Sequence, residues 1–129
     1  MSIPRVIPSM LLIDGLAYKS RKFKDHKYIG EPSNIIKIFN DKEIDELIVL
    51  DRSAHEKGLD LEVLSSISSQ SFFPLCYGGG LDSIKKVEEV ISLGFEKVIF
   101  NTVFYENPKL ISFAVSKFGS SAVSICLDY

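Results

Sequence analysis

Short, nearly continuous apolar runs alternate along the chain with segments in which apolar residues recur every three or four positions. A continuous apolar run predicts a strand that is buried on both faces, and the three-to-four spacing predicts a helix with one buried face. The predicted strands cover residues 6–13, 46–50, 72–77, 97–101 and 122–127. The predicted helices cover residues 32–41, 59–69, 83–93 and 108–118. Strands that alternate with helices in this way predict a parallel sheet covered by helices.

Two architectures fit this order, a doubly wound sheet and a (β/α)8 barrel. In both, binding and catalytic residues lie at the carboxyl ends of the strands. Those ends are polar here, because the strands are followed in turn by Asp14-Gly15 with a basic loop, Asp51, three glycines, Asn101-Thr102 and Asp128. Each residue taken alone is equally a turn or capping residue. Together, on one edge of a sheet, they indicate a binding site.

The three consecutive glycines, Gly78 to Gly80, lie between a predicted strand and a predicted helix. Glycine is favoured where the backbone needs a positive φ or where another group must approach it closely. Free N–H groups at the start of a helix suit a phosphate. A tight turn without a ligand is the alternative, since a glycine motif alone is a weak signal.

Composition indicates one soluble globular domain, with 129 residues, 46% of them hydrophobic, and a net charge of −2. The basic stretch at residues 19–27 is too short for a nucleic-acid site, and the first residues form neither a signal peptide nor a membrane span, so we expect a cytoplasmic protein. Cys76 and Cys126 lie in apolar runs without metal-ligand spacing. We therefore expect two buried free thiols, no metal and no cofactor.

Several short segments then occur in an order and spacing typical of one known family. They are RVIPS (5–9), DG (14–15), Lys19, GEP (30–32), DELIVLD (45–51), the glycines (78–80), KVIFNT (97–102), ENP (106–108) and LD (127–128). Through them the chain resembles, over almost its whole length, the first half of the cyclase subunit of imidazole glycerol phosphate synthase, which closes the imidazole ring in histidine biosynthesis. The resemblance implies a single α/β domain over residues 1–129, a parallel (βα)4β5 arrangement that is the first half of a (β/α)8 TIM barrel.

The resemblance also implies site residues. Gly80, Asn101 and Thr102 match a phosphate-binding set for a long phosphorylated ribonucleotide. Lys19 matches a loop lysine that closes over the substrate, and Asp51 matches an acid that holds the ligand. Asp128 corresponds to one of two catalytic aspartates, a general acid or base for the lyase-type cyclisation.

At the opposite ends of the strands, Arg5, Glu46 and Lys97 match a ring of charges at the entrance of an ammonia passage. The resemblance therefore implies a glutaminase subunit as the partner that delivers ammonia at this edge. Taken without the resemblance, the same residues are solvated charges at strand ends.

Leu11 is the main departure from the family pattern, because the partner of Asp128 in the family is an aspartate at this position. Leucine cannot transfer a proton. In this respect the chain is closer to a paralogous branch found in surface-polysaccharide and lipopolysaccharide gene clusters, which works with a glutaminase and a sugar amidotransferase. A non-catalytic half barrel that docks a glutaminase is a third interpretation, and a doubly wound nucleotide-binding domain is an unrelated one.

The chain ends one residue after Asp128, after four strand–helix units and a fifth strand. We expect a fragment whose open sheet edges and apolar faces favour self-association. The remaining rim residues of the family barrel lie outside it, so one copy cannot form the complete active site.

Overall fold

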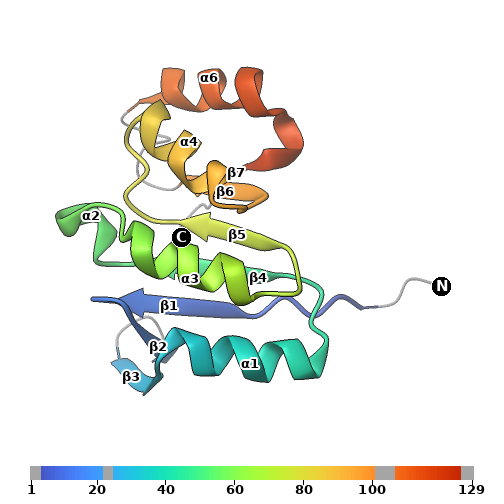
Figure 1. Cartoon of the computed structure of the whole chain (residues 1–129). Coiled ribbons are helices and arrows are strands. Elements are labelled where there is room, and N and C mark those ends of the chain that lie inside the picture. Colours follow the sequence, from blue (N-terminus) through green and yellow to red (C-terminus); the bar gives the residue numbers. More distant parts are fainter. Residues whose placement is uncertain (1–3, 22–24, 101–106, 126–129) are drawn as a thin grey trace.

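The computed structural model describes residues 4–21, 25–100 and 107–125. Within these residues the strands form one sheet in the order β3-β2-β1-β4-β5-β6-β7. The strands are β1 (Ser9–Ile13), β2 (Leu16–Arg21), β3 (Asp25–Gly30), β4 (Leu47–Asp51), β5 (Leu75–Gly78), β6 (Lys97–Phe100) and β7 (Val123–Ile125). The helices are α1 (Pro32–Lys42), α2 (Ala54–Lys57), α3 (Leu61–Gln70), α4 (Ile84–Ser92) and α6 (Pro108–Phe118), with a 3-10 turn, η1, at Ser120–Ala122 (Figure 1).

Five strands are parallel, and they lie side by side in the order β1, β4, β5, β6 and β7. One continuous core joins alternate residues of these strands, such as Leu12 and Val49, to apolar residues of the helices. Ile36 of α1, Leu64 of α3 and Val87 of α4 all belong to it. The four longer helices therefore cover the same face of the sheet. This confirms the predicted half barrel and excludes the doubly wound sheet, which has helices on both faces.

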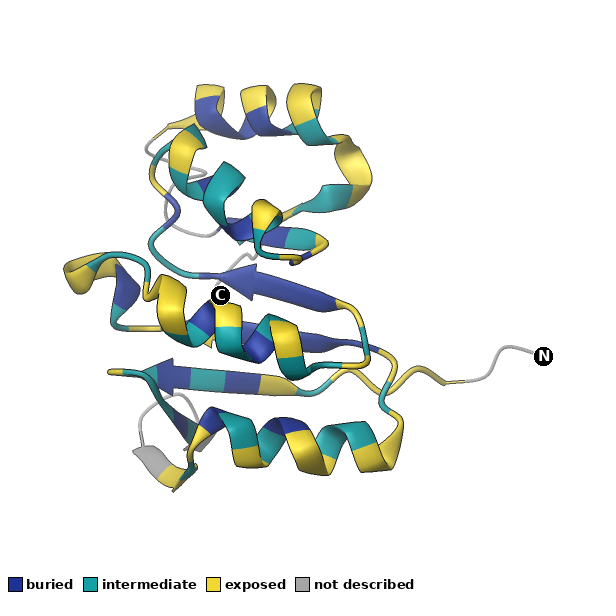
Figure 2. Ribbon diagram, viewed as in Figure 1, coloured by how far each residue is buried: buried dark blue, intermediate teal, exposed yellow. Residues whose placement is uncertain are grey.

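The opposite face of the sheet, called the inner face below, carries the residues that alternate with the core positions. It includes Leu11, Ile13, Glu46, Ile48, Leu50, Cys76, Gly78, Lys97 and Ile99. No helix of the described residues packs on it, and Leu50 is 36% exposed. In Figure 2 the strands contain many buried or half-buried positions, and the core residues that face the helices account for most of the buried ones.

The basic segment after Asp14-Gly15 is not the loop that the sequence predicts. Its described residues, 16–21 and 25–30, form β2 and β3, which pair antiparallel with each other, and β2 pairs antiparallel with β1. Asp14 and Gly15 both have positive φ, 52° and 80°, as in a two-residue turn that matches the twist of a hairpin. Charged side chains at the end of a sheet are compatible with strand structure because they protect an open edge. The charged residues of this segment led to the prediction of a loop, whereas the structure has a pair of strands.

The predicted helix signals are largely confirmed. Pro32 opens α1, and the side chains of Ser83 and Asn107 accept hydrogen bonds from the backbone N–H groups of Lys86 and Leu110. Gly119 ends α6. The side chains of Ser83 and Asn107 satisfy N–H groups that the first turn of a helix leaves without partners.

Some boundaries differ from the prediction. β1 begins at Ser9 rather than at Val6, and β5 begins at Leu75 rather than at Phe72. Pro8 and Pro74 stand just before these strands and have no N–H group to donate to a sheet. The short helix α2 and the start of α3 at Leu61, two residues later than predicted, are also new.

Candidate functional site

Asp51 is the last residue of β4 and lies at the strand-end edge of the sheet. Its side chain is buried, and Oδ1 accepts hydrogen bonds from the backbone N–H of Ser53 at 3.0 Å and from its hydroxyl at 2.8 Å. Burial raises the pKa of the Asp51 carboxyl, and these hydrogen bonds oppose part of that rise. Asp51 is thus a carboxylate that is held in place and partly desolvated.

Ser53 also connects Asp51 to the turn between β1 and β2. Its hydroxyl oxygen accepts a hydrogen bond of 3.0 Å from the backbone N–H of Asp14. The Asp14 carboxylate forms an ion pair with Lys57 of α2, and that hydrogen bond raises the pKa of Lys57. Through these contacts the position of the β2–β3 hairpin depends on the segment that follows β4.

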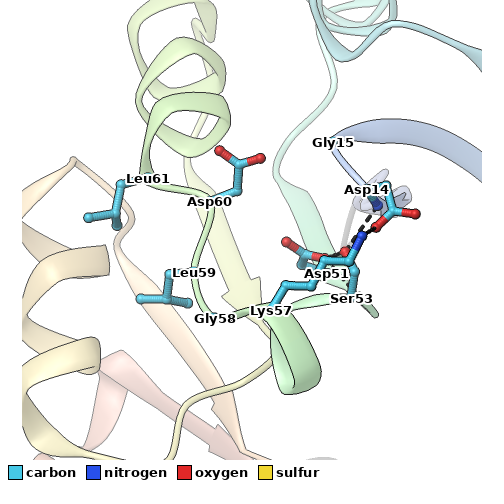
Figure 3. Close-up of a pocket in the computed structure, with 9 residues that line it drawn as sticks. All are labelled: Asp14, Gly15, Asp51, Ser53, Lys57, Gly58, Leu59, Asp60 and Leu61. Atoms are coloured by element: carbon cyan, nitrogen blue, oxygen red, sulfur yellow. Dashed lines mark hydrogen bonds and ion pairs between the residues drawn. The ribbon is translucent and has the colours of Figure 1, made fainter.

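A cavity of about 360 Å³ lies at this edge. It is lined by Asp14, Gly15, Asp51, Ser53, Lys57, Gly58, Leu59, Asp60 and Leu61 (Figure 3). Figure 3 shows Asp14, Asp51, Ser53 and Lys57 gathered together, with Asp60 apart from them at the start of α3. Asp60 accepts a hydrogen bond of 3.2 Å from the backbone N–H of Val63 and so caps that helix. Carboxylates and one amine around a cavity can orient the hydroxyl groups of a polar ligand.

The glycine turn packs directly against the same segment. A Cβ atom on Gly79 would lie 2.3 Å from the carbonyl oxygen of Asp51, and one on Gly80 would lie 2.7 Å from that of Ala54. Both glycines have positive φ, 133° and 63°. Close approach of two backbones therefore accounts for these glycines in the described structure. The phosphate role of Gly80 stays a prediction, together with that of Asn101 and Thr102, which lie outside the described residues.

Three further positions that the sequence predicts to be important are Lys19, Leu11 and Asp128. Lys19 lies in β2, opposite Lys27 of β3. Leu11 lies on the inner face of β1, in register with Leu50 of β4 and Tyr18 of β2. Asp51 shares its strand face with the core residues of β4, so it lies on the face opposite to Leu11. Asp128 lies outside the described residues.

At the strand-start edge, Glu46 and Lys97 form an ion pair with a distance of 3.3 Å between Oε1 and Nζ. Glu46 is 6% exposed, so a buried carboxylate is matched by a half-buried lysine. Arg5 is exposed four residues before β1, and no ion pair joins it to another described residue. The structure therefore joins Glu46 and Lys97 in an ion pair that does not include Arg5.

Cys76 stands on β5 between the strands that carry this pair. It is a buried free cysteine, as the sequence predicts. Burial raises the pKa of its thiol to about 11, and the nearby Glu46 carboxylate adds to the rise. Cys76 is therefore a neutral thiol at physiological pH. Cys126 lies outside the described residues.

Sequence reasoning missed Ser53, Lys57 and Asp60, which line the cavity. A weak signal for Asp60 exists, because an Asp placed before a helical apolar pattern is a good N-cap residue. Ser53 and Lys57 act through contacts with Asp14, about 40 residues earlier in the chain, and local sequence carries no sign of such pairs.

Tyr77 of β5 was also not predicted as a special residue. Its side chain is fully buried against Phe95, with ring centroids 5.8 Å apart, and its hydroxyl has no hydrogen-bond partner among the described residues. Burial raises the pKa of the Tyr77 hydroxyl, and the charges of Asp51 and Asp60 raise it further. Tyr77 therefore remains protonated beneath the strand-end edge.

In the described parts of the chain, no cluster of three or more His, Cys, Asp or Glu side chains could hold a metal ion. None of the helices over those same residues combines the length and the apolar character that crossing a membrane requires.

Comparison with known proteins gives a consistent result. A profile of the family described as "Histidine biosynthesis protein" matches residues 5–129. The "Putative imidazole glycerol phosphate synthase subunit HisF" of Leptospira borgpetersenii is 41% identical over 128 residues, which are 98% of this chain and 50% of that protein. The "Putative imidazole glycerol phosphate synthase subunit hisF2" of Pseudomonas aeruginosa is 43% identical over 126 residues, 96% of this chain and 50% of that protein.

A third similar protein is the "Imidazole glycerol phosphate synthase subunit HisF" of Staphylococcus aureus strain Newman. It is 36% identical over 126 residues, 96% of this chain and 50% of that protein. The chain thus spans about half the length of the curated relatives that it matches.

Proposed function

Because the chain belongs to the family of histidine biosynthesis proteins, we propose that it acts as a cyclase-type subunit of an imidazole glycerol phosphate synthase. In this role it receives ammonia from a glutaminase at the strand-start edge of the sheet. It uses that ammonia at the strand-end edge, on a phosphorylated ribonucleotide of histidine biosynthesis. The names of the relatives support the reaction class.

The observation that carries this proposal is the presence of two different polar edges on the same strands. β4 begins beside Glu46, which pairs with Lys97, and ends in the buried carboxylate of Asp51. Glu46 and Asp51 are five positions apart, which corresponds to roughly 16 Å of extended strand. Ammonia that enters beside Glu46 and Lys97 would pass along the inner face to reach the opposite edge.

At the strand-end edge the proposal gives each predicted residue a task. Backbone N–H groups around Gly80, at the approach to α4, bind one phosphate together with Asn101 and Thr102. Lys19, in β2, closes over the substrate as the matching lysine of the family does. Asp51 accepts hydrogen bonds from ligand hydroxyl groups, and Asp128 transfers the proton.

Leu11 favours a second candidate function. Its register partners on the neighbouring strands, Leu50 and Tyr18, are not acids either. The position that holds the first catalytic aspartate in the family is therefore apolar here, and loss of one member of an acid–base pair lowers a rate by about 100-fold to 10,000-fold. The second candidate is a paralogous subunit that delivers ammonia to a sugar amidotransferase in surface-polysaccharide biosynthesis. A glutaminase-docking half barrel without chemistry of its own is the remaining alternative.

One substitution distinguishes these functions. In a full-length version of the protein, with a complete barrel, turnover of the histidine-pathway ribonucleotide is measured with ammonium salt as the nitrogen source, for the wild type and for Leu11→Asp. For the second candidate, we expect negligible wild-type turnover and at least a 100-fold gain in Leu11→Asp, because the missing acid is restored. The matched control is Ile13→Asp, which places the same charge two residues away on the same face of β1 and should give no gain.

A wild-type rate close to that of a cyclase with both aspartates would support the first candidate and reject the second. No turnover by the wild type or by Leu11→Asp, combined with normal binding of a glutaminase, would leave the docking function as the best explanation.

A further inference from the structure

Tyr18 of β2 and Tyr28 of β3 form an aromatic pair on the hairpin, called the tyrosine pair below. They are cross-strand partners, and their ring centroids lie 5.6 Å apart at an interplanar angle of 67°. This edge-to-face arrangement is favourable for two aromatic rings. Tyr28 is nevertheless 52% exposed, so much of its ring surface stays open after Tyr18 has packed against it.

The register of the sheet places the tyrosine pair on the inner face. Tyr18 is the partner of Leu11 on β1, and Leu11 is the partner of Leu50 on β4. Residues that are partners on adjacent strands have side chains on the same face. Followed across the strands, this register forms one row without a charged residue, which consists of Tyr28, Tyr18, Leu11, Leu50, Gly78 and Ile99.

This row lies toward the strand-end edge of the sheet. Leu50 directly precedes Asp51, the last residue of β4, and Gly78 is the last residue of β5. A Cβ atom on Gly78 would lie 3.0 Å from Cδ2 of Leu50 and 3.3 Å from Cβ of Ile99. The side chains on both sides therefore close over this glycine, and the apolar surface continues across β5.

The hairpin extends this surface beyond the parallel strands. β2 pairs only with the end of β1, from Leu11 to Ile13, so the hairpin lies at the carboxyl end of β1 (Figure 1). The turn that begins the hairpin is fixed, because the backbone N–H of Asp14 donates a hydrogen bond to Ser53. An aromatic ring on a fixed backbone loses little conformational freedom when a ligand binds it.

From these observations we propose that the tyrosine pair binds the planar heterocyclic ring of the ribonucleotide, which stacks on the open surface of Tyr28. This inference rests on the proposed function, since that function names a ribonucleotide as the substrate. A row without charged side chains offers little to a phosphate group, whereas the flat face of a ring stacks well on an aromatic side chain. Leu11 continues the same apolar surface, so the leucine at this position suits a ring as its neighbour.

Isothermal titration calorimetry on a full-length version of the protein tests the stacking contact. It compares the histidine-pathway ribonucleotide with ribose 5-phosphate, which has a sugar and a phosphate but no heterocyclic ring. We expect Tyr28→Ala to weaken binding of the ribonucleotide by about 10-fold, because a stacking contact is lost, and to leave binding of ribose 5-phosphate unchanged.

Two further variants separate stacking from other roles of Tyr28. Tyr28→Phe should bind the ribonucleotide like the wild type, since the ring rather than the hydroxyl makes the contact. Tyr28→Leu, which keeps an apolar side chain without a ring, should lose nearly as much affinity as Tyr28→Ala. The matched control is Phe113→Ala, because Phe113 is similarly exposed, at 55%, but lies on the outer helix α6.

Each result decides between the inference and the function on which it rests. Unchanged affinity of Tyr28→Ala for the ribonucleotide would reject the stacking contact and leave the proposed function intact. An equal loss for both ligands would also reject it, because Tyr28 would then shape the hairpin rather than bind the ring. A wild type that binds ribose 5-phosphate but no ribonucleotide would reject the cyclase function and the stacking contact together.

Discussion

At the scale of single residues, Asp51 and Ser53 connect the parts of the strand-end edge. Asp51 is buried, and the hydroxyl of Ser53 donates to it while accepting from the backbone of Asp14. Removing water from a carboxyl group favours its neutral form, whereas hydrogen bonds to the carboxylate favour the ionised form. Burial is the larger effect here, so the pKa of Asp51 is raised.

This raised pKa predicts a pH-dependent effect of Asp51→Asn. Because the folded-state pKa lies above the unfolded value of 3.8, ionisation of Asp51 lowers the free energy of unfolding of the wild type as the pH rises from that value through the folded pKa. Asparagine does not ionise and still offers an oxygen to Ser53. The stability of Asp51→Asn relative to wild type should therefore increase with pH over this window.

Urea denaturation at a series of pH values measures that difference. Asp41→Asn, which removes the same charge from an exposed position on α1, controls for the change in net charge. A relative stability that decreases with pH would show that hydrogen bonding, rather than burial, dominates at Asp51.

At the scale of elements, the glycine turn after β5 is defined by its contact with the segment after β4. Gly79 and Gly80 approach the backbone of Asp51 and Ala54 more closely than any side chain would allow. The same segment continues into α2, whose Lys57 pairs with Asp14. The turn between β1 and β2, the segment after β4 and the turn after β5 therefore form one connected strand-end edge.

We predict that Gly79→Ala destabilises the fold much more than Gly119→Ala does. Both glycines have positive φ, which costs an L-residue about 1–2 kcal/mol. A Cβ at Gly119 has no atom within 4 Å, whereas a Cβ at Gly79 meets the Asp51 carbonyl at 2.3 Å. Overpacking of this kind adds about 1–3 kcal/mol. Urea denaturation of the two variants checks the difference, and equal losses of unfolding free energy would contradict the packing explanation.

At the scale of the whole molecule, helices cover one face of the sheet, and none of the described helices packs on the inner face. Leu11, Ile48, Leu50 and Ile99 give that inner face an apolar character. In a complete barrel such residues pack against those of other strands at the centre. In the 129-residue chain on its own, a second copy can offer the same kind of surface.

Self-association of the isolated chain is therefore expected to depend on the inner face. Leu50→Lys should shift the chain toward monomer in sedimentation velocity, because pairing of the faces would bury the added charge. Ile38→Lys is the matched control, since Ile38 is similarly apolar and 48% exposed but lies on the outer helix α1. An unchanged association state in Leu50→Lys would indicate that copies meet elsewhere, for example through open sheet edges.

The sequence by itself determined the helices and the parallel strands. Their signals are local, since the spacing of apolar residues and the caps at Ser83, Asn107 and Gly119 depend on neighbours within a few positions. The match of short motifs along the chain also predicted the family. The family pattern predicted that Arg5, Glu46 and Lys97 share the strand-start edge, and the ion pair joins two of these three residues, Glu46 and Lys97.

Only the tertiary structure decided how distant segments meet. The hairpin of β2 and β3, the bridge from Ser53 to Asp14 and the face to which Asp51 belongs were all absent from the prediction. The contact of Gly79 with Asp51 was likewise not predicted, because it joins two turns that are 28 positions apart in the sequence. Periodicity reports which face of an element is buried, whereas register and backbone approach between distant elements are set by the packing of the whole sheet.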